Sequence, residues 1–301
     1  MLKRILDSIK KGNLGDKVIK NLIILFSPNY SIANAKWRWY TYKNLKRKYK
    51  KIIDEFVPNE LNHKNSKNIW ILWLQGYENA PDLVKCCINS VRRNAKGANV
   101  IVLDNENINQ YIKFPNYIEK KWNEGKICPA HYSDLIRLEL LCKYGGTWLD
   151  STVLCTSNND CNYVFEENFF VYKQMDLSRQ NNNPIVASNW FIHSVSNNNI
   201  LLLTRKLLHE YWKKHDYPID YFIFHLFFTI ATEKYNQEWE HVPVFNNNSP
   251  HTLQFELKNK YENKRWEQIL RMSDFHKLNH HDDYSGCHDT YYNYILKEYL
   301  D

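Results

Sequence analysis

The segment 127–154 constrains the fold more than any other part of the chain, because a helix, a reversal and a strand follow one another in it without a linker. Its apolar residues recur at helical spacing: Leu135, Ile136, Leu138, Leu140 and Leu141. Ser133 and Asp134 mark the predicted start of the helix. Arg137 lies three residues after Asp134, so the two side chains share one side of the helix.

Two glycines, Gly145 and Gly146, supply the left-handed residue that ends this helix and reverses the chain. The residues that follow favour a strand: Thr147, Trp148, Leu149 and Val153. Asp150 falls at or just beyond the carboxyl end of that strand, which is where ligands bind in open α/β sheets. A solvated aspartate after a strand is also common, so Asp150 taken alone leaves a structural role open.

The segments before this stretch predict an α/β fold with a parallel sheet. The apolar run 69–74 is typical of a buried strand, and 99–104 is a second such run that ends in the carboxylate of Asp104. A helix over 81–93, begun by Pro81, lies between them. The order strand, helix, strand indicates a right-handed crossover.

The pattern after the central stretch predicts two more strands, over 169–173 and 185–192, separated by a loop that contains 181–183. Asn189 falls in the second strand, although asparagine is also a frequent turn residue. Helical patterns cover three further segments: 111–126, 199–212 and 218–231.

The basic charge is concentrated near the N-terminus. The net charge is +7, but residues 1–51 carry 14 Lys and Arg against 2 Asp, which gives +12, whereas the remainder carries 26 against 31, which gives −5. Residues 1–60 therefore read as a basic helical segment, and 61–301 as the main domain. Two partners for this basic segment stay open. One is an anionic bilayer, whose binding each cation would strengthen by about 1 kcal/mol, and the other is the main domain itself. Nucleic acid would be a third possible partner, but no nucleic-acid-binding motif supports it.

No run approaches the roughly 20 apolar residues of a membrane span, and the N-terminus lacks the apolar core of a signal peptide. The seven cysteines form no C-x-x-C pair and lie mostly among apolar residues, so we expect reduced, packed thiols, Cys128 included. These features predict a cytoplasmic protein, or one peripheral at the inner face of the membrane.

The central stretch resembles the DXD-type sugar-nucleotide glycosyltransferases, in particular the bacterial capsular polysaccharide synthesis proteins and the family 32 transferases. The matching residues are Ser133, Asp134 and Arg137, then Tyr144, Gly145 and Gly146, then Trp148 and Asp150. Thr152 stands where many relatives carry the second Asp of the motif.

This resemblance implies a GT-A (Rossmann-like) nucleotide-sugar transferase fold with a mainly helical N-terminal appendage. It implies transfer of a hexosyl unit from a UDP-sugar to a surface or capsular polysaccharide precursor, plausibly lipid-linked, with retention of configuration. Asp134 would hold sugar hydroxyls, Arg137 the diphosphate or a hydroxyl, and Asp150 the ribose and a metal. Asn189 would approach the reacting sugar.

The same resemblance implies how the nucleotide is held. Trp73 would stack on the uracil beside Gln75 and Gly76, although Trp73 filling the core is an equal alternative. Asp104 and Trp148 would complete the nucleotide site. The stretch FHKLNHHDDYSG resembles a lid over the donor, in which His276 and Lys277 would meet the diphosphate or metal, and a solvated polar loop is the alternative.

A divalent cation, Mn²⁺ or Mg²⁺, would be held by Asp150 and Thr152, but a hydroxyl is a weaker ligand than a carboxylate, so metal dependence stays open. Two other readings stay open as well. One is a non-catalytic nucleotide or carbohydrate-binding protein that keeps the fold, which Thr152 favours. The other is a toxin-like transferase that glycosylates proteins.

Overall fold

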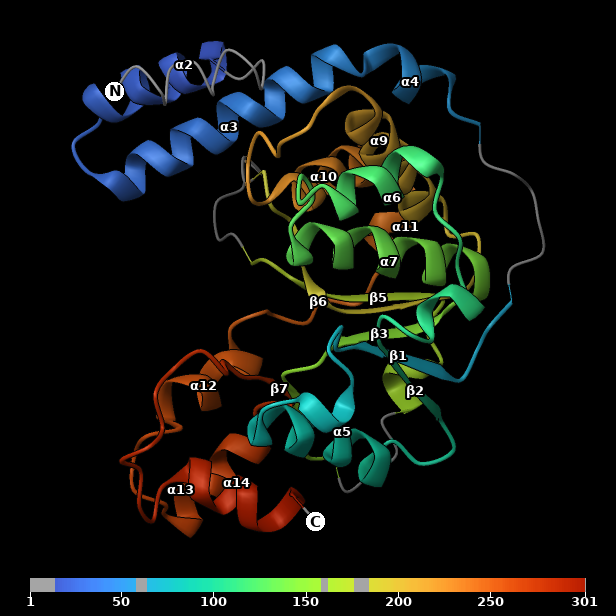
Figure 1. The fold of residues 1–301 in the computed structure, drawn as a ribbon. Helices are drawn as coiled ribbons and strands as arrows, with labels where there is room; N and C mark the ends of the chain where they lie inside the picture. Colours follow the sequence, from blue (N-terminus) through green and yellow to red (C-terminus); the bar gives the residue numbers. More distant parts are fainter. Residues whose placement is uncertain (1–13, 58–63, 158–161, 176–183, 301) are drawn as a thin grey trace.

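The computed structural model describes residues 14–57, 64–157, 162–175 and 184–300. A five-stranded sheet with the order β2-β1-β3-β6-β5 lies at its centre (Figure 1). Its strands are β1 (Asn68–Leu72), β2 (Asn99–Leu103), β3 (Gly146–Asp150), β5 (Phe169–Lys173) and β6 (Ala187–Ser194). The first three strands are parallel to one another, whereas β6 runs antiparallel to both β3 and β5.

Helices cover both faces of this sheet (Figure 1). One face carries α6 (Asn116–Asn123), α7 (Pro129–Tyr144), α9 (Asn199–Lys214), α10 (Ile223–Lys234) and α11 (Asn236–His241). The other carries α5 (Asp82–Asn94), α12 (Thr252–Glu256), α13 (Asn263–Leu270) and α14 (Tyr291–Tyr299), with a two-stranded sheet of β4 (Val153–Cys155) and β7 (Phe275–Lys277). Four short helical turns complete the described elements: η1 (Tyr77–Asn79), η2 (Ile108–Gln110), α8 (Asn162–Phe165) and η3 (Ser249–His251).

Alternation along β1 explains why both faces are covered. Ile69 and Ile71 belong to the core on the α5 side, whereas Trp70 and Leu72 belong to the core on the α7 side. Successive side chains of a strand point to opposite faces, so an apolar run with no polar alternation needs a hydrophobic layer on each side. The predicted α/β, Rossmann-like architecture with a helical N-terminal segment is confirmed.

The N-terminal segment forms α2 (Leu14–Leu25), α3 (Tyr30–Lys48) and α4 (Lys50–Glu55), and α2 and α3 pair as a hairpin at one edge of the molecule (Figure 1). One side of α3 is buried and packs against α10. No residue of α2 is buried. The part of the predicted segment before residue 14 lies outside the described residues, and the boundary at residue 60 stays a prediction.

The glycine reversal after α7 is confirmed, and it needs both glycines. Gly145 has φ of 69° and Gly146 has φ of 92°. A Cβ on Gly145 would lie 2.8 Å from the backbone nitrogen of Ser196, and one on Gly146 would lie 2.4 Å from the carbonyl oxygen of Asn68. Backbone therefore passes where any other residue would place a side chain, which lets β3 start directly beside β1.

Some predicted bounds were wrong. The helix predicted to begin at Ser133 begins at Pro129, whose ring suits the first helical position. The helix predicted over 111–126 is reduced to the short α6, and the one predicted over 218–231 begins only at Ile223. The loop predicted at 181–183 lies outside the described residues.

The strand order reverses between β1 and β3, and this position decides where a ligand can enter. From β1 the chain crosses to β2 on one side, and it returns to place β3 on the other side of β1. The connecting helices therefore leave a crevice at the carboxyl ends of these two neighbouring strands.

Candidate functional site

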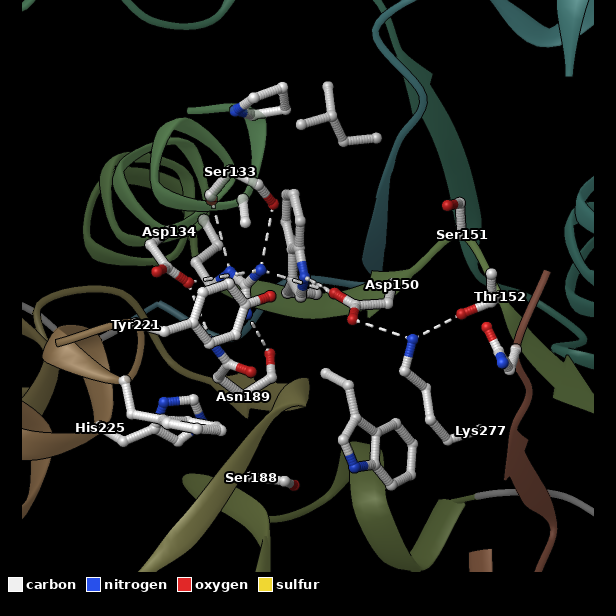
Figure 2. Close-up of a pocket in the computed structure, with 18 of the residues that line it drawn as sticks. Ser133, Asp134, Asp150, Ser151, Thr152, Ser188, Asn189, Tyr221, His225 and Lys277 are labelled. Carbon is white, nitrogen blue, oxygen red and sulfur yellow. Dashed lines mark hydrogen bonds and ion pairs between the residues drawn. The ribbon is translucent and has the colours of Figure 1, made fainter. Parts of the chain in front are cut away.

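A cavity of about 850 Å³ opens at this crevice (Figure 2). Its walls include the residues after β1, the end of β3, the start of α7, part of β6, the segment before α10 and the segment 277–281. The predicted site residues that line it are Trp73, Gln75, Asp134, Arg137, Trp148, Asp150, Thr152, Asn189 and Lys277. Residues that are far apart in the chain thus meet at one position in the fold.

Arg137 joins the two carboxylates of the site. Its Nη2 lies 3.6 Å from Asp134 Oδ1 and 3.5 Å from Asp150 Oδ1. The same nitrogen donates to Ser133 Oγ at 3.0 Å, and Nη1 donates to the carbonyl oxygen of Asn189 at 2.5 Å (Figure 2). The guanidinium also lies 4.9 Å from the ring centroid of Trp148, and Arg137 is only 4% exposed. Arg137 therefore orients the two acids from inside the protein wall.

Asp134 is held from three sides. Besides its contact with Arg137, it accepts a hydrogen bond at Oδ1 from Asn189 Nδ2 at 2.9 Å, and its Oδ2 lies 3.6 Å from His131 Nδ1. Burial opposes charge on His131, but the neighbouring carboxylate of Asp134 and thiol of Cys128 outweigh that effect and raise its pKa to about 9. His131 is therefore a cation at neutral pH. Sequence reasoning missed it.

Cys128, which was expected to pack in the interior, is exposed at the start of α7. The neighbouring His131 lowers the pKa of the thiol, against the opposing effect of partial desolvation. The expectation of a packed thiol at this position was wrong, because the helix begins at Pro129 and leaves the preceding residue at the surface.

Asp150 occupies the carboxyl end of β3, as predicted. Burial raises the pKa of this carboxyl, but the positive charges of Lys277 and Arg137 and the hydrogen bond from Trp148 outweigh that effect and lower its pKa. Trp148 Nε1 donates to Asp150 Oδ1 at 3.0 Å, and Lys277 Nζ lies 3.2 Å from Oδ2. Trp148 is thus a buried support for Asp150, and Asp150 is ionised at neutral pH.

The two predicted metal ligands both contact an ammonium group. Lys277 Nζ donates to Thr152 Oγ1 at 2.5 Å while it pairs with Asp150 (Figure 2). Within the described residues, no group of three or more His, Cys, Asp or Glu side chains is arranged to hold a metal ion. One carboxylate and one hydroxyl, bridged by a lysine, do not fit the oxygen-rich ligand set that Mg²⁺ or Mn²⁺ prefers.

The predicted nucleotide-binding residues separate into two groups. Trp73 and Gln75 line the cavity just beyond β1, and the Trp73 ring meets His280 edge to face at a centroid distance of 5.3 Å. Gly76, with φ of 84°, does not line the cavity. Asp104 lies outside the lining, where its Oδ1 accepts hydrogen bonds from the backbone of Glu106 and Asn107 and closes a turn.

The structure does not bring His276 to the cavity. Its side chain is 0% exposed and bonds to Thr156 Oγ1 at 3.0 Å, and burial lowers its pKa to about 4. Because side chains alternate along β7, Lys277 faces the cavity while His276 faces the opposite way. His280 and His281, from the loop after β7, line the cavity instead.

Three further lining residues escaped sequence reasoning: Arg38, Tyr221 and His225. Arg38 comes from α3, and its guanidinium lies 4.3 Å from the ring centroid of Phe222. Burial lowers the pKa of His225 to about 4, so this histidine is neutral near pH 7. No local spacing signals these positions, because Arg38 lies on α3 and the other two lie next to or on α10, far from the central stretch in the sequence.

Comparisons with known proteins identify enzymes that transfer sugars. An O-glycosyltransferase, braB, of Annulohypoxylon truncatum is 35% identical over 96 residues, which cover 29% of this chain and 23% of that protein. The glycosyltransferase afumC of Aspergillus fumigatus is 35% identical over 99 residues, which cover 30% of this chain and 25% of that protein. The chain thus spans about a quarter of the length of these relatives.

Among solved structures, the PaToxG glycosyltransferase aligns with 78% of this chain and 86% of its own, with 16% sequence identity and a TM-score of 0.35. The family of capsular polysaccharide synthesis proteins matches residues 23–295, which is nearly the whole sequence. This chain belongs to the capsular polysaccharide synthesis protein family.

Proposed function

We propose that the protein is a glycosyltransferase that moves a sugar from a UDP-sugar to a surface or capsular polysaccharide precursor. The observation that carries the proposal is the arrangement of Asp134, Arg137 and Asp150 in one cavity at the crevice between β1 and β3. Membership of the capsular polysaccharide synthesis family and similarity to enzymes named glycosyltransferases support it.

The cavity has a nucleotide end and a sugar end. The uracil would stack beside Trp73 and His280, the ribose would meet Asp150, and the diphosphate would lie next to Lys277. The sugar would then reach the polar wall formed by Asp134 and Asn189, whose carboxylate and amide can receive and donate hydrogen bonds. Both side chains are fixed by bonds to neighbours, so the wall is organised before a sugar binds.

Transfer at this site needs no covalent enzyme intermediate. The acceptor hydroxyl attacks C1 of the sugar from the face that UDP leaves, so the C1–O bond to acceptor forms as the C1–O bond to phosphate breaks. The acceptor proton passes to an oxygen of the departing β-phosphate, and configuration is retained. Positive charge from Lys277 stabilises the leaving diphosphate, an electrostatic contribution that usually dominates such reactions. No step is assigned to a metal ion, because the ligand set does not fit one.

Substitution of the acids tests this function. We expect Asp150→Ala and Asp134→Ala to lower hydrolysis of UDP-glucose or UDP-galactose, or transfer from them to membrane extract, at least about a hundredfold. Glu139→Ala, at a partly exposed acid on the far side of α7, serves as the matched control. Folded variants that keep the parent rate would disprove the site. Tight UDP binding by the parent without turnover of any sugar nucleotide would favour the non-catalytic binding protein.

We also propose that the α2–α3 hairpin binds an anionic bilayer. Four apolar side chains of α2 recur on one side of the helix and are exposed, and Phe26 and Tyr30 continue the patch around the turn: Leu14, Val18, Leu22, Leu25, Phe26 and Tyr30. A helix with an apolar stripe and no buried residue has no protein surface to cover it within the described residues.

The charge of the same hairpin favours a bilayer over a second copy of the chain. Residues 14–48 carry 8 Lys and Arg against the single acid Asp16, a balance of +7. Asp16 is itself bonded to Tyr217. Two such hairpins would repel each other, whereas anionic lipid attracts each cation by about 1 kcal/mol. None of the described helices is both long and apolar enough to cross a membrane, so contact would be at the surface.

Sedimentation with lipid vesicles tests the hairpin. Phe26→Glu should weaken binding to phosphatidylglycerol-containing vesicles at least about tenfold, because a charged group replaces buried apolar area. Phe255→Glu is the matched control, since Phe255 is 78% exposed and Phe26 77%. Pure phosphatidylcholine should bind the parent weakly. Unchanged binding of Phe26→Glu, or dimerisation of the parent that Phe26→Glu abolishes, would refute bilayer contact.

A further inference from the structure

Lys277 occupies the position between Asp150 and Thr152 that the resemblance gives to a metal ion. Its ammonium nitrogen is 3.2 Å from Asp150 Oδ2 and 2.5 Å from Thr152 Oγ1 (Figure 2). An ammonium carries three N–H donors, and these two contacts use two of them. The third is left for a ligand in the cavity, which Lys277 lines.

The backbone fixes this position. Lys277 is paired with Val153 across the β4–β7 sheet, and the backbone N–H of Leu278 donates to the carbonyl oxygen of Thr152 at 2.9 Å. The backbone of Lys277 therefore lies opposite Val153, one residue along from Thr152, and its side chain brings the ammonium to both Asp150 and Thr152. The lysine side chain is only 22% exposed, so its charge acts in a region partly shielded from water.

Thr152 suits a lysine better than it suits a metal. Its oxygen accepts the N–H of Lys277, which leaves the hydroxyl hydrogen free to donate to a phosphate oxygen. An aspartate at this position would instead create two carboxylates around one cation. Thr152 therefore matches Lys277: a hydroxyl stands where the resemblance expects a carboxylate, and an ammonium stands where it expects a metal ion.

We propose that the Lys277 ammonium, with the Thr152 hydroxyl, binds the diphosphate of the sugar nucleotide in place of a divalent cation. This inference rests on the proposed function, because it assumes a nucleoside diphosphate in the cavity. Lys277 donates its remaining N–H to a β-phosphate oxygen, Thr152 donates its O–H, and Asp150 keeps the ammonium in position. The charge that builds on UDP as the sugar leaves is neutralised by a group of the protein itself.

Calorimetric titration with UDP and with uridine tests the proposal on the full chain. The parent should bind UDP with equal affinity in EDTA and in Mn²⁺. Lys277→Met should weaken UDP binding about tenfold or more and leave uridine binding within about twofold, because only UDP has the diphosphate. Lys264→Met, at an exposed lysine of α13, should change neither affinity.

A second variant should create the metal site that the parent lacks. Lys277→Ala combined with Thr152→Asp places two carboxylates together, so UDP binding should become dependent on Mn²⁺, with bound Mn²⁺ visible by electron paramagnetic resonance. Loss of UDP binding by the parent in EDTA, or tenfold tighter binding in Mn²⁺, would overturn the role of Lys277 and leave the transferase proposal standing. No UDP binding under either condition would overturn both.

Discussion

His131 shows how a single buried side chain behind the cavity wall couples charge to stability. It lies next to Asp134 and Cys128, and its pKa of about 9 is far above the ordinary value of 6.5. Folding therefore favours the protonated form. The stability that this residue contributes is complete below about pH 6.5 and is lost as the pH rises through about 9.

We therefore expect the stability difference between the parent and His131→Gln to depend on pH. Urea denaturation should show a difference that is larger at about pH 6 than at about pH 9.5, by on the order of 2 kcal/mol. His241→Gln, at an exposed histidine of α11, is the matched control. A difference for His131→Gln that stays constant over this range would show that its protonation is not linked to folding.

At the level of the elements, the reversal after α7 is the part of the fold that tolerates least change. Gly146 has φ of 92°, and its missing Cβ would lie 2.4 Å from the carbonyl oxygen of Asn68 at the start of β1. Gly97 has a similar φ of 76°, but nothing lies within 4 Å of its missing Cβ. Replacing Gly97 would therefore introduce backbone strain alone, whereas replacing Gly146 would add a steric clash.

Gly97→Ala should lower the free energy of unfolding by about 1 kcal/mol, whereas Gly146→Ala should lower it by at least about 3 kcal/mol, because β3 must move away from β1. Chemical denaturation of both variants under the same conditions measures the difference. Equal losses would mean that β1 and β3 can separate without cost, which would contradict the tight pairing described here.

Local sequence patterns predicted those helices, turns and strands whose formation depends only on residues close together in the sequence. The spacing of Asp134 and Arg137, the two glycines and the strand that ends at Asp150 lie within one segment, so their relation follows from helix and turn geometry. The face of the sheet to which a strand residue points is harder to predict, because an error of one residue in the strand reverses it. For this reason Lys277 reaches the cavity and His276, its neighbour, does not.

Long-range packing explains what the sequence did not predict. Arg38 is separated from the central stretch by two strands and three α-helices, and it reaches the cavity through the packing of α3 against α10. At the scale of the whole molecule, the basic N-terminal segment is therefore more than a covering layer. It supplies the guanidinium of Arg38 to the cavity that Tyr221 and Phe222 also line.

Arg38→Gln should separate donor binding from transfer. Arg38 contacts Asp220 and Phe222, which we expect to lie near the acceptor. UDP affinity should therefore change less than about twofold, while sugar transfer to membrane extract falls about tenfold through loss of a charge-assisted hydrogen bond to the acceptor. Arg47→Gln, at an exposed arginine of the same helix, is the control. Equal loss of UDP affinity and transfer would place Arg38 at the donor.

The cavity takes its cations from α3, α7 and β7 and its acids from α7 and β3, so the working site is assembled from distant parts of the chain. A nascent polypeptide synthesised as far as α10 would already hold Asp134, Arg137 and Asp150, but the ammonium that pairs with Asp150 would still be untranslated. The pairing of β7 with β4 is therefore what completes the charge balance around Asp150.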